Sequence, residues 1–352
     1  MQGKSRLIDS LRFPMAVLVV AAHSDIKGNM FSQSISHVLA HVAVPIFFMI
    51  SGFLFFKGIE TWKWDKWKHK IVSRVNTLLI PYVIWITLYL AIHLTIPSLS
   101  DYWCANQWNL DRLDIWGNPN ISSSPALVPM WFIRDLIVCI SITPIIYFLF
   151  HKPKGLCDYV KIVVSSTIVL LLYLSQTSLC IPGVSSFSIF YFCFGALLSL
   201  NGFELKRTTH VLISIIAFLL FVIEIIYDGH NTIIGNYIYP FYVLAAVLAV
   251  IGLFNCLVTS NNVWQKLLVN FLEKNADTSF FIFASHIFIL PYVAVVLNKV
   301  NEKTGINSLL GETVATSCVY MLKIFITTTI CVMLYRILQK YLPKLLKLIC
   351  GK

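Results

Sequence analysis

The sequence predicts an all-α integral membrane protein with about ten transmembrane helices and both termini in the cytoplasm. Hydrophobic residues make up 58% of the 352 residues and charged residues only 12%, whereas soluble globular domains carry roughly 25% charged residues. Apolar segments of bilayer-spanning length recur along the whole chain. Lys and Arg concentrate between these segments on one predicted side, which gives the orientation.

Ten apolar segments account for the predicted spans. They lie near residues 7–26, 36–56, 75–97, 128–150, 160–176, 187–200, 209–227, 237–258, 279–298 and 314–336. The first follows Lys4 and Arg6 and resembles a signal peptide. Because no small-residue cleavage site follows it, we interpret it as a retained first helix.

The loop charges test the topology independently of hydropathy. Twenty Lys and Arg residues fall on the predicted side of the N-terminus and four on the opposite side. By the positive-inside rule, both termini of a ten-span chain are cytoplasmic. The Lys and Arg residues behind the net charge of +11 are therefore distributed along the chain according to membrane topology. They form no basic nucleic-acid-binding domain. We expect one transmembrane domain over residues 1–340 and a basic cytoplasmic tail over residues 341–352.

The nine cysteines show no paired CxxC spacing, and most lie in apolar segments, so we predict no metal site. Cys104 and Cys180 fall in predicted outer loops. They either form a disulfide or stay as two thiols.

The first span contains "RFPMAVLVVAAH", which places Arg12 and His23 at its two ends. In a helix, eleven residues bring both groups to one face about 16 Å apart, too far for direct contact. Arg12 either snorkels to the headgroups or serves a ligand, and Asp9 lies three residues away as a possible partner. His23 is either a hydrogen-bonded buried imidazole or a proton acceptor, the role for which histidine is best suited at neutral pH.

Two further segments suggest ligand contacts. "VPIFFMISGFLFF" carries Ser51 and Gly52, which form a helix-packing crevice or approach a ligand. The basic segment before the third span includes Lys70 and Arg74. It binds lipid headgroups or grips the phosphates of an anionic co-substrate.

The remaining ionisable groups inside predicted spans are also candidates, because charge at bilayer depth is costly. In "MWFIRDLIV", Arg134 and Asp135 point about 100° apart on a helix, so we expect them to serve different partners. With Trp131 they line an acceptor entrance or anchor the interface.

Three more ionisable residues lie in later spans. "SFFIFASHIFIL" places His286 in the ninth span, where we assign it a supporting role. Glu224 and Lys323 are expected to form a structural ion pair with no catalytic role.

These segments, in this order and spacing, resemble the membrane acyltransferase 3 family of bacteria over essentially the whole chain. The resemblance implies a ten-helix domain in the inner membrane that moves an acyl group, usually acetyl, from cytoplasmic acyl-coenzyme A to a hydroxyl of a cell-surface or lipid-linked glycan. It implies that Arg12 and His23 are the essential pair. Lys70 and Arg74 occupy the family's basic motif, although the tighter Arg-x-x-Arg form is absent here.

A mechanism follows from the same residues. Lys70 and Arg74, with Arg12, would hold the anionic end of acyl-coenzyme A. His23 would take the proton of the acceptor hydroxyl or be acylated itself. The alternatives are a secondary transporter, for which no related halves are visible, and an inactive sensor or scaffold.

Overall fold

The computed structural model describes residues 2–95, 115–117, 124–152, 155–175, 181–202, 207–227, 232–304 and 311–351. Every element in these ranges is helical. By contacts, the chain divides into two compact units, each discontinuous in sequence. The first unit comprises residues 1–44, 101–108 and 206–343, and the second comprises residues 45–100, 109–205 and 344–352.

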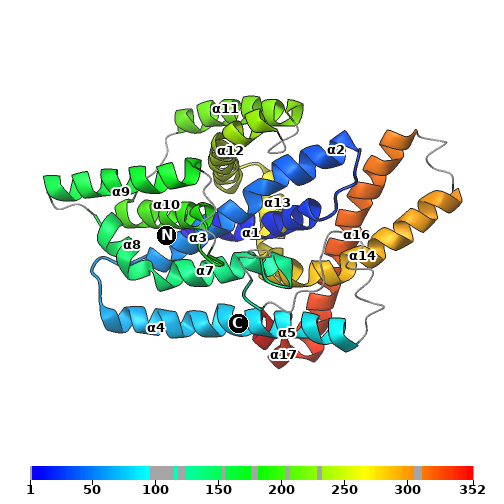
Figure 1. The fold of residues 1–352 in the computed structure, drawn as a ribbon, viewed down its shortest axis with the longest axis horizontal. Coiled ribbons are helices and arrows are strands. Elements are labelled where there is room, and N and C mark those ends of the chain that lie inside the picture. The colour runs from blue at the N-terminus through cyan, green and yellow to red at the C-terminus, as the bar shows by residue number, and fades with distance from the viewer. Residues whose placement is uncertain are drawn as a thin grey trace. The chain divides into compact units, whose positions relative to one another are not determined.

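The first unit contains the long helices α14 and α16, which lie side by side, and α11, which lies along α12 (Figure 1). Its elements are α1 (Gln2–Ala22), α2 (Met30–Gln33), the π-helical turn η1 (Ser34–Val38), η2 (Leu39–Val42), α11 (Arg207–Ile226), α12 (Ile233–Thr259), α13 (Val263–Asn275), η6 (Ala276–Thr278), α14 (Ser279–Thr304) and α16 (Glu312–Tyr341).

The second unit begins within α3 and ends with the C-terminal helix. Its elements are α3 (Ala43–Phe56), α4 (Trp64–Arg74), η3 (Val75–Leu79), α5 (Ile80–Thr95), η4 (Val128–Met130), α7 (Trp131–Ser141), α8 (Thr143–Phe150), α9 (Leu156–Leu174), α10 (Ser186–Asn201) and α17 (Pro343–Cys350).

Seven helices in the described ranges are long and apolar enough to cross a membrane, so the chain is a multi-pass membrane protein. Each overlaps one of the ten predicted spans over most of its length. The other three predicted spans are also helical, but they differ from simple spans. Helix α1 carries Arg6, Asp9 and Arg12, the helix pair α7 and α8 is bent by 60°, and α10 has only 16 residues.

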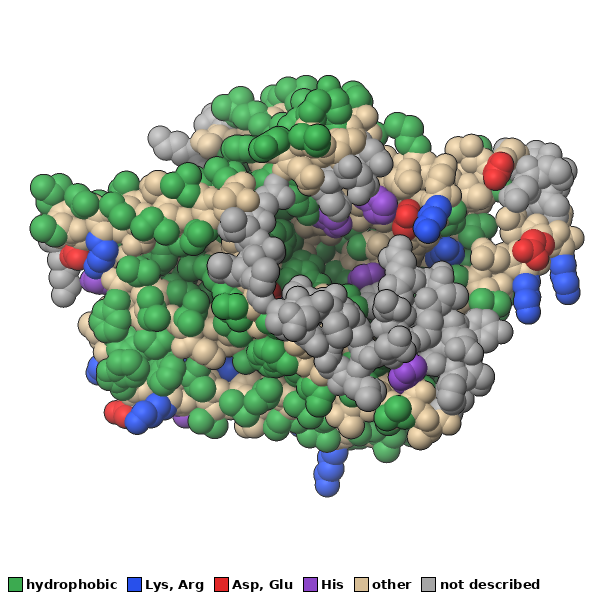
Figure 2. Space-filling view, in the orientation of Figure 1, with side chains coloured by type: hydrophobic (Ala, Val, Ile, Leu, Met, Phe, Trp, Pro, Cys, Tyr) green, Lys and Arg blue, Asp and Glu red, His purple; other side chains and the backbone are tan. Residues whose placement is uncertain are grey.

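Large apolar side chains are exposed along α9 and α11, each within its own unit (Figure 2). A soluble protein rarely exposes such continuous apolar surface. These residues are Leu156, Val160, Val163, Val164, Ile168 and Leu171 on α9, and Val211, Leu212, Ile215, Phe218, Leu219 and Val222 on α11. The two helix faces therefore suit contact with lipid tails.

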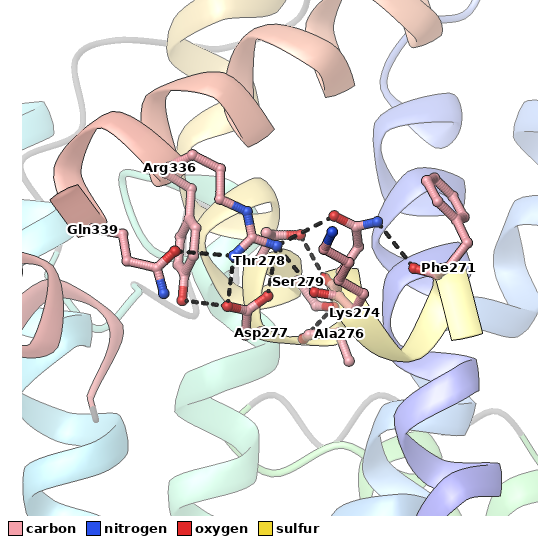
Figure 3. Close-up of polar contacts among 10 residues, drawn as sticks. Phe271, Lys274, Ala276, Asp277, Thr278, Ser279, Arg336 and Gln339 are labelled. Atoms are coloured by element: carbon pink, nitrogen blue, oxygen red, sulfur yellow. Dashed lines mark hydrogen bonds and ion pairs between the residues drawn. The ribbon is translucent and has the colours of Figure 1, made fainter. Parts of the chain in front are cut away.

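Within the first unit, a polar cluster fixes the start of α14 against the end of α16 (Figure 3). Both terminal nitrogens of Arg336 donate to the carboxylate of Asp277, at 3.0 and 3.2 Å. The Tyr335 hydroxyl donates to the same carboxylate at 3.1 Å. Arg336 also donates to the carbonyl oxygen of Lys274, at 3.0 Å. Bidentate pairs of this kind fix orientation as well as adding stability.

Within the second unit, glycines let α3 and α10 pack with their backbones in contact. A Cβ on Gly52 would overlap the carbonyl oxygen of Phe192, and one on Gly195 would overlap the carbonyl oxygen of Met49. Small residues at helix crossings allow this close approach in membranes. Gly52 therefore serves helix packing, one of the two roles that its sequence context allows.

Replacing Gly52 by Ala is expected to lower the free energy of unfolding by about 1–3 kcal/mol, because the added methyl group has no space. Unfolding in mixed micelles with increasing SDS measures the change. Ser51→Ala is the matched control, since it adds no atom one residue earlier on α3. Equal stability of the two variants would contradict the close contact of α3 and α10.

The predicted basic tail forms a short helix that packs within the second unit. Leu346 and Cys350 of α17 are buried. The indole nitrogen of Trp85 on α5 donates to the carbonyl oxygen of Ile349 at 2.9 Å. The charged residues of this segment therefore lie on the exposed face of an amphipathic helix, whose other face packs within the second unit.

Candidate active site

Two histidines from distant parts of the sequence meet in the first unit. His23 is the first residue after α1, and His286 lies in the second turn of α14. Their ring centroids are 5.2 Å apart and their planes are inclined by 31°. His286 is completely buried, whereas His23 remains exposed. His23 is therefore the accessible member of the pair, and the buried ring of His286 packs against it.

The backbone of α14 fixes the tautomer of His286. Its Nδ1 lies 3.1 Å from the carbonyl oxygen of Ile282 and 2.8 Å from that of Phe283. Carbonyl oxygens only accept hydrogen bonds, so Nδ1 carries the hydrogen. The Nε2 lone pair is buried and has no hydrogen-bond partner among the described residues. The site thus holds an oriented acceptor directly behind His23.

Apolar packing brings the two histidines together. The end of α1 contributes Val20 and Ala21 to a buried cluster with Ile282 of α14 and Ile324 of α16. The Tyr320 hydroxyl of α16 donates to the carbonyl oxygen of Ala21 at 3.1 Å, which also satisfies an acceptor at the end of α1. At the other end of α1, Arg6 pairs with Glu273 at 2.9 Å.

Asp25, two residues after His23, is held by the segment that follows it. Its Oδ1 accepts from the hydroxyls of Ser32 at 3.0 Å and Ser36 at 3.2 Å. Its Oδ2 lies 3.3 Å from Nε2 of His37. The carboxylate is thus oriented by α2 and by η1, a π-helical turn of the kind that often marks functional sites.

Asn29 ties the same segment to α16. Its side chain accepts from the amide of Ser32 at 2.8 Å and so caps α2. Its Nδ2 donates to Thr316 at 2.7 Å and to Ser317 at 3.0 Å. Residues 24–29 therefore lie against the first half of α16.

Ser32, Ser36 and His37 are residues of this site that were not predicted from the sequence. Ser32 lies in the polar stretch between the first two predicted spans, which a short outer loop also explains, whereas Ser36 and His37 begin the second predicted span. Only the tertiary packing of α2 and of the π-helical turn η1 brings the three side chains to one carboxylate.

The expected ion pair between Glu224 and Lys323 is absent, so this prediction is wrong. Glu224 of α11 is completely buried, and neither carboxylate oxygen has a hydrogen-bond partner in the described ranges. The reason is tertiary: α16 faces the segment that follows His23, while α11 packs along α12.

The family model described as an acyltransferase domain matches residues 6–336, a range that contains both histidines and Asp25. The chain belongs to the acyltransferase 3 family. Neither the curated proteins nor the solved structures that were searched contain a match.

Arg12 of this acyltransferase 3 protein pairs with Asp9, as its spacing predicts. Nη1 of Arg12 lies 3.3 Å from Oδ1 of Asp9, and each side chain is 39% exposed. A three-residue helical spacing allows this contact. The exposed part of the guanidinium is available to an anion.

The predicted basic residues of the acyltransferase lie in the second unit. Lys66, Lys70 and Arg74 follow at four-residue intervals, so they share one face of α4. Lys70 donates to the carbonyl oxygen of Phe55 and lies 5.2 Å from the centroid of its ring. An ammonium has three N–H groups, so Lys70 keeps donors for another partner. Ser51 is half-buried on α3.

The expectation that Arg134 and Asp135 serve different partners is wrong. Arg134 donates to Oδ1 of Asp135 through Nε at 3.0 Å and Nη2 at 2.7 Å. Nη1 donates to the carbonyl oxygen of Trp116 at 2.8 Å, and Ser188 donates to Oδ2 of Asp135 at 2.8 Å. Both side chains are buried. Neighbouring residues on a helix point about 100° apart, and the long arginine side chain bends back across this angle to reach the carboxylate.

Trp131 packs among aromatic residues of the second unit. Its ring lies 6.3 Å from that of Phe48 and 6.4 Å from that of Phe187. Its predicted contact with an acceptor stays a prediction. Cys104 and Cys180 lie outside the described residues.

Proposed function

We propose that this acyltransferase 3 protein is a membrane O-acyltransferase. It would move an acyl group, acetyl in the first instance, from cytoplasmic acyl-coenzyme A to a hydroxyl of a cell-surface polysaccharide or a lipid-linked glycan. The observation that carries the proposal is the pairing of an exposed imidazole, His23, with a buried imidazole of fixed tautomer, His286.

In the proposed reaction, the acceptor hydroxyl attacks the carbonyl carbon of the thioester. A C–O bond forms, the C–S bond breaks, and His23 takes the proton of the hydroxyl as general base. The same proton then passes to the departing thiolate, so coenzyme A leaves as a thiol. The fixed acceptor at Nε2 of His286 favours one orientation of the neighbouring imidazole, as the third member does in hydrolase triads.

The donor needs cationic groups for its phosphates. Lys66, Lys70 and Arg74 present three positive charges on one face of α4, an arrangement suited to phosphate. Arg12, part exposed beside Asp9, is a further cationic candidate.

Release of coenzyme A thiol by purified protein in nanodiscs tests the donor half of this proposal. We expect Lys70→Ala combined with Arg74→Ala to raise the KM for acetyl-coenzyme A by about 10- to 100-fold, the loss of one or two charge-assisted hydrogen bonds. Lys340→Ala combined with Lys344→Ala is the matched control, because it removes the same charge from exposed positions. An unchanged KM would assign the basic face to lipid headgroups instead.

A further inference from the structure

Lys323 is a buried cation that the proposed reaction leaves unused. The residue is 8% exposed on α16. No hydrogen bond or salt bridge to another described residue involves its ammonium group. The ammonium nitrogen is not one of the fully buried atoms that lack a partner, so it reaches accessible space, where its three N–H groups can donate to acceptor oxygens.

Two contacts place Lys323 beside the segment that carries His23. The Tyr320 hydroxyl, one turn earlier on α16, donates to the carbonyl oxygen of Ala21. Ser317, a further turn earlier, accepts from Asn29. Asp25 lies between Ala21 and Asn29 in the chain, so these two contacts hold it near the part of α16 that carries Tyr320 and Lys323.

Asp25 and Lys323 form no ion pair with each other among the described residues, and each keeps some hydrogen-bonding capacity. A carboxylate offers about four acceptor positions. Asp25 uses three of them for Ser32, Ser36 and His37. A ligand hydroxyl complements what is left, because it can accept from the ammonium and donate to the carboxylate. Since the charges of Asp25 and Lys323 cancel, an additional ionic group on the ligand gains little here.

We propose that Lys323 and Asp25 bind a hydroxyl of a neutral, polyhydroxylated acceptor and so present a neighbouring hydroxyl to His23. This inference rests on the proposed acyltransferase function and names the acceptor class of the same site. It assigns Lys323 and Asp25 to acceptor binding and leaves the donor to other residues.

The test uses protein in nanodiscs, labelled acetyl-coenzyme A, and an envelope-glycan extract separated by anion exchange into neutral and acidic fractions. We expect the wild-type protein to label the neutral fraction. Lys323→Met is expected to raise the neutral-glycan concentration for half-maximal transfer by about tenfold or more. The KM for acetyl-coenzyme A and its slow hydrolysis without acceptor should not change. Lys299→Met, at an exposed position of α14, is the matched control.

Asp25→Asn provides a second variant if Lys323→Met does not fold, and it should weaken acceptor use without changing the KM for the donor. Labelling of the acidic fraction alone would overturn the assignment. So would an equal loss of donor hydrolysis and acceptor transfer in folded Lys323→Met protein. If the wild-type protein neither hydrolyses nor transfers the acetyl group, the proposed function fails first, and the acceptor assignment falls with it.

Discussion

Replacing His23 by Ala is expected to reduce acyl transfer by about 10²- to 10⁴-fold, the contribution usual for a general base. The loss follows because His23 is the exposed imidazole of the pair, and the buried His286 cannot take its place without moving α14. Initial rates of coenzyme A thiol release, with acceptor present, give the measurement. The thermal midpoint of the variant in detergent should stay near that of the wild type, since an exposed side chain is removed.

His69→Ala is the control for this substitution, because His69 is an exposed histidine on α4. It should leave both rate and stability unchanged. If His23→Ala lost its fold together with its activity, His23 would be a structural residue. The proposed mechanism would then lose its general base.

Replacing Asp135 by Ala is expected to lower the free energy of unfolding by about 3–5 kcal/mol, the cost usual for leaving a buried charge without its partner. Arg134 donates twice to Asp135, and the two side chains are 4% and 1% exposed. Ser188 would also lose its acceptor. Unfolding in SDS mixed micelles measures the effect.

Two comparisons separate this effect from a general loss of charge. Asp65→Ala removes an exposed carboxylate from α4 and should change stability by less than about 0.5 kcal/mol. Replacing Arg134 by Met together with Asp135 by Leu should recover much of the loss, because no buried charge is left unpaired. A stable Asp135→Ala variant would show that the guanidinium reaches water.

The helices were largely predictable, because bilayer-spanning apolar length is a local property of the sequence. Each of the ten predicted ranges consists mainly of helix in the described part of the chain. The bend between α7 and α8 and the short length of α10 depend on packing. A hydropathy average over a window of residues detects neither the bend nor the short length. The division into two units, each made from separate stretches of chain, left no signal in composition.

The two histidines of the candidate site were predictable as single residues, but their arrangement and the groups that hold Asp25 were not. Histidine chemistry singled out His23 and His286 separately, but no periodicity relates positions so far apart in sequence. The Arg12–Asp9 contact was predictable because helical spacing fixes it. The pairing of Arg134 with Asp135 was missed because helical angles describe where side chains start, and a long side chain can bend back.

Transfer of labelled acetyl from acetyl-coenzyme A to an envelope-glycan extract, by wild-type protein in nanodiscs, tests the acyltransferase proposal most directly. We expect label to appear in the glycan at a rate that depends on the protein, with one coenzyme A thiol released for each acetyl group transferred. Folded wild-type protein that transfers no label, with succinyl-coenzyme A as with acetyl-coenzyme A, would contradict the proposal.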